Sequence, residues 1–193
     1  MSATTTPQAR PARSFERHPD ALGTTARLIF DNLQGMHGLG AHDSDLLSRA
    51  AAGLRFIRCA ETYSIVEQRL FRLALVGLDE TDSFLVEAAA CYAADLIGVG
   101  DSRIWWQIAP RDERRALWFA ATLRLADALC QGGTDAPEDV YAAWTDAILY
   151  LEFDGDCVGA AHLARARQRV AALEALTGRR VELASSAVRR GAA

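Results

Sequence analysis

Lysine is absent from this chain of 193 residues, in which all 21 basic side chains are arginines. Its absence excludes a Schiff-base lysine and the lysine of a G-x-x-x-x-G-K-[ST] nucleotide loop. This composition is typical of a GC-rich genome, but it also has a chemical consequence. Every fixed cation is a planar guanidinium, which does not titrate and bonds a carboxylate or phosphate through two parallel N–H groups.

Long apolar runs are absent as well. No stretch of about 18 uninterrupted apolar residues occurs, so we expect no membrane partner. The 25 acidic residues outnumber the arginines and give a formal net charge of −4. A nucleic-acid partner is therefore not expected, because it would need a strongly basic face. Hydrophobic residues make up 50% and charged residues 24% of the chain, the balance of an ordinary soluble globular protein.

Cysteine is sparse, and its spacing forms no motif. Cys59, Cys91, Cys130 and Cys157 stand far apart, without a C-x-x-C pair. We expect reduced, buried thiols in a cytoplasmic protein. Residues 1–17 are polar and carry no apolar stretch, so we expect a disordered tail there and no signal peptide.

Helical periodicity dominates the chain up to residue 131. It predicts helices at residues 20–34, 43–60, 62–76, 79–96 and 111–130, which are separated by polar or glycine-rich breaks. Between the last two, Trp105 and Trp106 lie in a short helix or turn. With Trp118 they supply either a dimer surface or core packing, and the sequence leaves the two open.

The pattern changes after residue 132. Residues 140–144 and 148–153 predict two short strands, and the sequence DGD at 154–156 follows as a turn. One long helix at 159–176 and a last short strand at 181–183 complete this part. We therefore expect a mainly α fold, in which a helical body precedes a small mixed lobe.

Few residues have the spacing of a catalytic or metal site. The DGD turn at 154–156 lacks the further acidic ligands of a calcium loop. His37 and His42 flank a glycine-rich loop, but two histidines without a carboxylate or thiolate partner are more often solvated than metal-bound. Arg124 and Asp127 share a face of the apolar helix 111–130, either as an ion pair at the helix edge or as an inherited site.

Four stretches carry a family resemblance. They are DLLSRAAAGL (45–54), ALVGLD (74–79) with FLVEAAACY (84–92), RRALWFAATLRLADAL (114–129), and ILYLEF (148–153) with LTGRRVEL (176–183). In order and spacing they resemble the C-terminal helical domain of the exopolyphosphatase/guanosine-pentaphosphatase (Ppx/GppA) family. The resemblance covers about residues 20–184.

The resemblance implies a fold related to the HD phosphohydrolases. It implies an HD-like helical bundle at residues 18–131, with a small α+β lobe at 132–184 packed on it. Disordered tails are expected at 1–17 and 185–193. Helices 43–60, 62–76 and 111–130 are expected to converge, because their family counterparts surround the ancestral metal site.

At the positions of that ancestral site, this chain has other residues than the family. The sequence reads LRFIR at 54–58 where the family has Leu-His-x-Ile-Gly, and Arg69 stands where another family histidine would fall. Asp127 is the one position that still matches a ligand. Arginine cannot bind a metal cation, so we expect no metal and no cofactor. The chain also lacks the glycine-rich phosphate loops of the family's catalytic domain, so no catalytic residue is assigned.

Three functions stay open at this point. The first is a non-catalytic module that binds a phosphorylated ligand (polyphosphate or a guanosine polyphosphate nucleotide), a separate catalytic-domain protein, or a second copy in a homodimer. The second is an active exopolyphosphatase-like phosphohydrolase, and the third is a helical ligand-sensing regulator. The candidate ligand-binding residues are the arginines near the ancestral site and its aspartate: Arg55, Arg58, Arg69, Arg72, Arg124 and Asp127.

These arginines have a simpler interpretation, a solvated helix surface balanced by Glu61 and Glu67. The opposing hypothesis is that Arg55 and Arg69 point toward Asp127. An arginine–carboxylate bridge would then do structurally what the metal once did, since a buried carboxylate needs a compensating cation.

Overall fold

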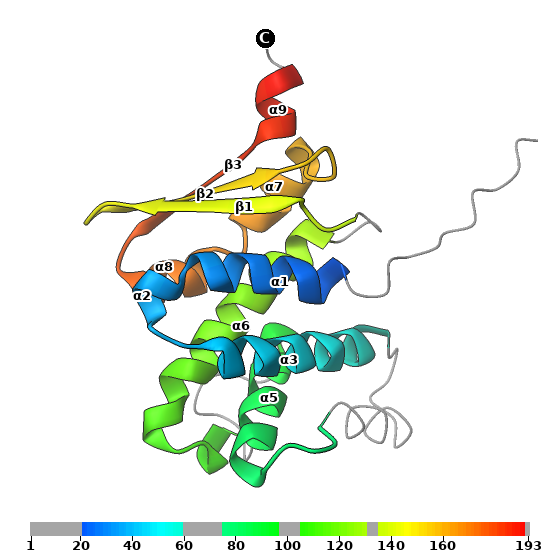
Figure 1. The fold of residues 1–193 in the computed structure, drawn as a ribbon, viewed down its shortest axis with the longest axis vertical. Coiled ribbons are helices and arrows are strands. Elements are labelled where there is room, and N and C mark those ends of the chain that lie inside the picture. Colours follow the sequence, from blue (N-terminus) through cyan, green and yellow to red (C-terminus); the bar gives the residue numbers. More distant parts are fainter. Residues whose placement is uncertain (1–20, 60–74, 97–104, 131–134, 192–193) are drawn as a thin grey trace, which may run out of the picture.

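The computed structural model describes residues 21–59, 75–96, 105–130 and 135–191. The elements in chain order are α1 (Ala21–Asn32), α2 (Gln34–His37), α3 (Ala41–Cys59), α5 (Glu80–Ala93), η1 (Trp105–Gln107), α6 (Pro110–Cys130), β1 (Asp139–Trp144), β2 (Ile148–Asp154), α7 (Ala160–Arg167), α8 (Ala171–Thr177), β3 (Arg180–Ser185) and α9 (Ser186–Gly191). Most of the described chain is helical and one small sheet joins the helices, which confirms the mainly α class (Figure 1).

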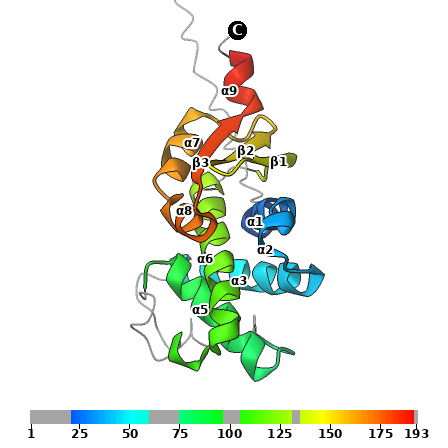
Figure 2. The same cartoon turned by 90° about the vertical axis from the view of Figure 1, so that its left-hand side faces the viewer.

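The central element is α6, which contacts α1, α3, α5, α7 and α8. Its apolar residues face almost every direction, as expected of a helix that is surrounded by others. It begins at Pro110, where the missing N–H of proline costs nothing. Figure 2 shows α6 running from the end of the molecule near α5 up to the sheet.

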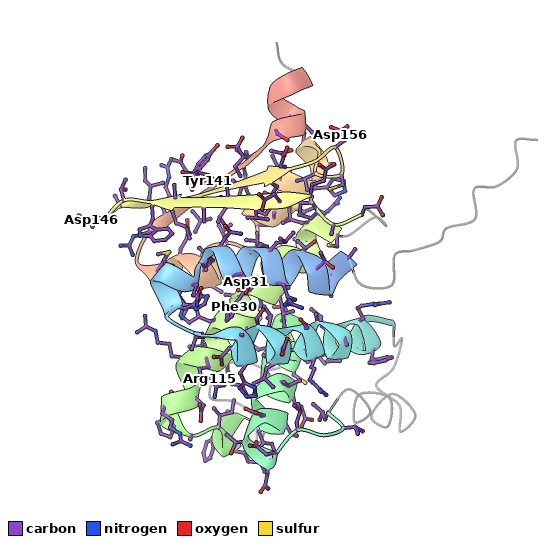
Figure 3. All side chains as sticks on the ribbon, in the orientation of Figure 1. Phe30, Asp31, Arg115, Tyr141, Asp146 and Asp156 are labelled. Carbon is purple, nitrogen blue, oxygen red and sulfur yellow. The ribbon has the colours of Figure 1, made fainter. Side chains whose placement is uncertain are left out.

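The sheet has the order β1-β2-β3. Strands β1 and β2 form an antiparallel hairpin, and β3 runs parallel to β2 after the crossover through α7 and α8. Alternation buries Leu149, Leu151 and Phe153 of β2, which face the helices. Tyr141 is 62% exposed and projects from the face turned away from α1 (Figure 3).

One hydrophobic core connects the helices and the sheet. It extends from Leu22 in α1 to Leu183 in β3 without interruption. Trp118 is 1% exposed and belongs to this core, whereas Trp106 is 80% exposed. The cysteines described here are free thiols, of which Cys91 is buried and the two at 130 and 157 are half-buried. None of the described helices is long and apolar enough to cross a bilayer.

Two predicted helices differ from the structure. The helix expected at 20–34 is interrupted at Leu33, so that α1 and α2 follow as separate elements. The long helix expected at 159–176 is wrong, because residues 168–170 form a turn between α7 and α8. In this turn the N–H of Gln168 donates to the backbone oxygen of Arg165, and the N–H of Arg169 donates to that of Ala166. Each bond thus spans three residues instead of the four of an α-helix. The turn redirects the chain, so that both α7 and α8 pack against α6.

Two boundaries also need correction. Helix α3 begins at Ala41, because the Asp43 carboxylate bonds the N–H of Gly40 from inside the first turn. Residues 186–191 form α9, where a disordered tail was expected from residue 185 onward. The expected tail at 1–17 lies outside the described residues, as does nearly all of the expected helix at 62–76.

Candidate anion-binding site

The arginines predicted from the family resemblance do not form one described cluster. Arg55 is exposed on α3, and its guanidinium makes no hydrogen bond or ion pair with a described residue. Arg69 and Arg72 lie outside the described residues, and so does the side chain of Arg58. Asp127 is half-buried on α6. A bridge between Asp127 and Arg69 therefore stays a prediction, whereas Arg55 bonds no residue of the described ranges, Asp127 included.

Arg124 ties α6 to the end of α5. Its Nη2 donates to the backbone oxygen of Tyr92 at 2.7 Å and to Oδ1 of Asp95 at 2.5 Å. The guanidinium carbon lies 4.2 Å from the centroid of the Tyr92 ring. Arg169 bonds the other Asp95 oxygen at 2.8 Å. Arg124 is thus engaged in tertiary contacts through its Nε and Nη2 atoms.

An arginine–carboxylate bridge does join the helices, through a residue that the sequence did not single out. Arg115 Nη2 lies 2.6 Å from Asp43 Oδ1 of α3, and its Nη1 lies 2.7 Å from Asp112 Oδ1 of α6. Figure 3 labels Arg115. Burial alone would raise the pKa of Asp112, but the hydrogen bonds and charges of Arg115 and Arg111 together outweigh it and hold that pKa below its usual value. Asp82 of α5 lies 3.9 Å from the same guanidinium, so three helices meet here.

The two histidines that were candidates for a shared metal bind separate partners. Nε2 of His37 lies 2.8 Å from the Phe30 oxygen, and its Nδ1 accepts from the N–H of Leu39 at 2.9 Å. These roles require the neutral tautomer, and burial lowers the pKa of His37. His42 bonds Asp82 at 2.9 Å instead. No group of three or more metal-ligating side chains occurs among the described residues.

The best candidate site is a cleft between the helices and the sheet, of about 210 Å³. Its lining comes from α2, α6, the end of β1, and the end of α8 with the turn after it: Gly35, Met36, Arg114, Trp118, Trp144, Leu176, Thr177 and Arg179. We call it the arginine–tryptophan cleft. These described lining residues include two arginines and no carboxylate, so the cleft is positive.

Two tryptophans shape this cleft. Trp144 lies against Gly35, where a β-carbon would come within 3.1 Å of its Cζ2 and Cη2 atoms. Glycine is thus needed for the ring to approach α2 so closely. Trp118 is buried, yet its Nε1 has no hydrogen-bond partner in the structure. A buried donor without a partner is uncommon and destabilising.

The two arginines of the cleft are held differently. Arg179 follows the left-handed Gly178 that ends α8. Its Nε donates to the Thr145 oxygen at 2.6 Å and its Nη1 to the Thr177 oxygen at 2.9 Å. These carbonyls orient the guanidinium but leave its charge uncompensated. Arg114 is exposed on α6 and makes no ion pair or hydrogen bond with a described residue.

The described lining of the cleft offers hydrogen-bond donors to an anion. Among the described lining residues there is no carboxylate, histidine or cysteine to act as a base or nucleophile. The Thr177 hydroxyl already donates to the Leu173 oxygen at 2.9 Å. The described lining thus supplies hydrogen-bond donors and no general base or nucleophile.

Sequence patterns did not indicate this cleft. Arg114 and Arg179 fall inside the stretches that resemble the family, but no spacing marks them as partners. Trp118 was noted only as a core or interface residue. No protein-family model matches the sequence, and no curated protein sequence matches it significantly.

Proposed function

We propose that this protein is a non-catalytic module that binds a phosphorylated ligand, with a degenerate Ppx/GppA-type HD-like bundle as its scaffold. The observation that carries the proposal is the arginine–tryptophan cleft. There, two arginines and Trp118, whose buried indole N–H is unpaired, line one small hollow, and its described lining holds no acidic residue. Polyphosphate and guanosine polyphosphates are the ligands that the family resemblance favours.

The energetics support an oxyanion in the cleft. A hydrogen bond from a charged donor to an anion contributes about 1.5–3 kcal/mol, and an unpaired buried donor costs about 1–3 kcal/mol. A phosphate oxygen at Trp118 Nε1 would remove that cost. Arg179 is already oriented by two backbone oxygens, so little side-chain freedom is lost when an anion binds.

The cleft fits one phosphate group better than a long chain. Its volume of about 210 Å³ lies below the roughly 300–1,000 Å³ of sites that enclose drug-sized ligands. We expect a terminal phosphate to enter the cleft while the rest of the ligand stays outside. A partner catalytic protein and a homodimer stay predictions from the resemblance.

Calorimetry with inorganic tripolyphosphate and with GTP tests the proposal. Arg114→Gln is the main variant, because in the described part of the chain this side chain has no hydrogen bond or ion pair to lose. We expect it to weaken binding by roughly 10–150-fold, the factor equal to one charged hydrogen bond. Trp118→Phe removes the indole N–H, and we expect it to weaken binding while the fold is kept.

Arg111→Gln is the matched control, since Arg111 is an exposed arginine on the same helix but outside the cleft. It should change the affinity by less than about twofold, as expected of an exposed charge. The proposal fails if neither ligand binds at about 1 mM. It also fails if Arg114→Gln and Arg111→Gln weaken binding equally, because the anion would then sense only net charge.

A further inference from the structure

A second cavity, of about 230 Å³, lies between α1 and the start of α3. Its lining residues are Arg27, Asp31, Gln34, His37, Leu39, Gly40, Ala41 and Ser44. We call it the α1–α3 cavity. Its two α2 residues, Gln34 and His37, share the face of that helix opposite to Gly35 and Met36, so α2 separates it from the arginine–tryptophan cleft.

One wall of this cavity is the first turn of α3. The preceding residue, Gly40, has no side chain that could accept hydrogen bonds from the free N–H groups of this turn. The Asp43 carboxylate does not cap them either, because it bonds the N–H of Gly40 and the guanidinium of Arg115. The positive end of a 19-residue helix therefore faces the cavity.

Ser44 gives an independent sign of a ligand at this wall. It is 3% exposed, and its hydroxyl Oγ has no hydrogen-bond partner in the structure. A helical serine usually bonds the carbonyl four residues back, which would satisfy its hydroxyl. Here Ser44 is one of the residues that line the cavity, and the hydrogen-bonding capacity of its buried hydroxyl is unused.

The opposite wall carries a positive and a negative charge that do not meet. Arg27 and Asp31 are four residues apart on α1, a spacing at which opposite charges commonly pair. Neither makes an ion pair or hydrogen bond with a described residue, and both line the cavity (Figure 3 labels Asp31). His37 adds no charge, because its two nitrogens are bonded in the neutral form.

We propose that the α1–α3 cavity binds a small free α-amino acid. The ligand's carboxylate would accept from the first turn of α3, the Ser44 hydroxyl and Arg27, while its ammonium group would bond Asp31. The charges that line the cavity sum to zero, which suits a zwitterion rather than the phosphate of the other cleft. The volume of about 230 Å³ limits the ligand to a small molecule.

Calorimetry on the full chain tests this site with glycine, L-alanine, L-serine and L-glutamine. Propionate and ethylammonium are the matched probes, because each carries only one of the two charges. We expect at least one amino acid to bind and both single-charge probes to bind about tenfold more weakly. Failure of all four amino acids to bind at about 10 mM, or equal binding of propionate, overturns the proposal.

Two variants locate the site. Ser44→Ala removes a hydroxyl that bonds no described residue, and Asp31→Asn removes an exposed charge, so we expect both to fold normally. Each should weaken amino-acid binding about tenfold. Arg114→Gln, in the other cleft, should leave it unchanged. Unchanged affinity in Ser44→Ala and Asp31→Asn overturns the proposal, whatever the result for phosphorylated ligands.

Discussion

Replacing Arg115 with methionine removes the cation that joins α3 to α6. In the native protein the guanidinium bonds Asp43 at 2.6 Å and Asp112 at 2.7 Å. The two aspartates are 9% and 5% exposed, so solvent cannot replace the lost partner. Methionine keeps most of the apolar stem, which means that the variant reports the loss of the charge and its hydrogen bonds.

The expected loss follows from this burial. Breaking a buried ion pair by removing one partner costs about 3–5 kcal/mol, because an uncompensated charge is left behind. The Arg115 side chain is 22% exposed. We therefore expect the free energy of unfolding to fall by about 3 kcal/mol, the low end of this range. That is a large part of the roughly 5–15 kcal/mol that stabilises a typical domain.

Urea denaturation followed by circular dichroism measures this loss. Arg111→Met is the matched control: Arg111 also bonds Asp112, at 3.3 Å, but its side chain is 82% exposed. We expect the control to lose at most about 1 kcal/mol. Combining Arg115→Met with Asp43→Asn should recover part of the loss, since the Asp43 charge that has lost its guanidinium is then removed, whereas Asp112 keeps its bond to Arg111. A loss below about 1 kcal/mol for Arg115→Met, or one equal to that of Arg111→Met, would refute the reasoning.

Three further predictions concern pH, thiol reactivity and the shape of the cleft. Burial lowers the pKa of His37 below its ordinary 6.5, so the unfolded chain takes up a proton first as pH falls. The free energy of unfolding should therefore decrease from pH 6.5 downward, and less steeply in His37→Gln, when urea titrations at several pH values are compared. Burial raises the pKa of the Cys91 thiol to about 12, so mass spectrometry should find it unmodified by iodoacetamide at neutral pH in the native protein and modified after unfolding. Gly35→Ala would place a β-carbon 3.1 Å from the Trp144 ring and should weaken tripolyphosphate binding, whereas Gly40→Ala meets no atom within 4 Å and should leave it unchanged; equal affinities in the two variants would contradict the proposed cleft.

Local sequence signals determined much of the fold. The apolar helix predicted at 111–130 is α6, and the strands predicted at 140–144 and 148–153 are β1 and β2 to within one residue. Asp79 caps α5 by accepting from the N–H of Asp82. These features depend on periodicity, capping and turn residues within a few positions, which a sequence displays directly.

The break between α7 and α8 could not be predicted from the sequence, because tertiary packing overrides the local helical pattern there. Helical periodicity runs unbroken through residues 159–176, but the structure bends the chain at 168–170. Packing decides this bend: α7 contacts both α6 and β3, and α8 must turn to contact them as well. Arg169, placed by the same turn, reaches Asp95 at the end of α5.

Only the tertiary structure decided which charged residues act together. The sequence indicated Arg124 as a ligand-binding residue, but Asp95, 29 positions away, engages it. Arg115 reaches Asp43 across 72 positions, and the cleft brings Arg114 beside Arg179. The sequence shows the same residue type whether an arginine bonds a carboxylate, solvent or a ligand. Its role depends on which side chains the packed helices bring within hydrogen-bond distance, and no local pattern encodes that distance.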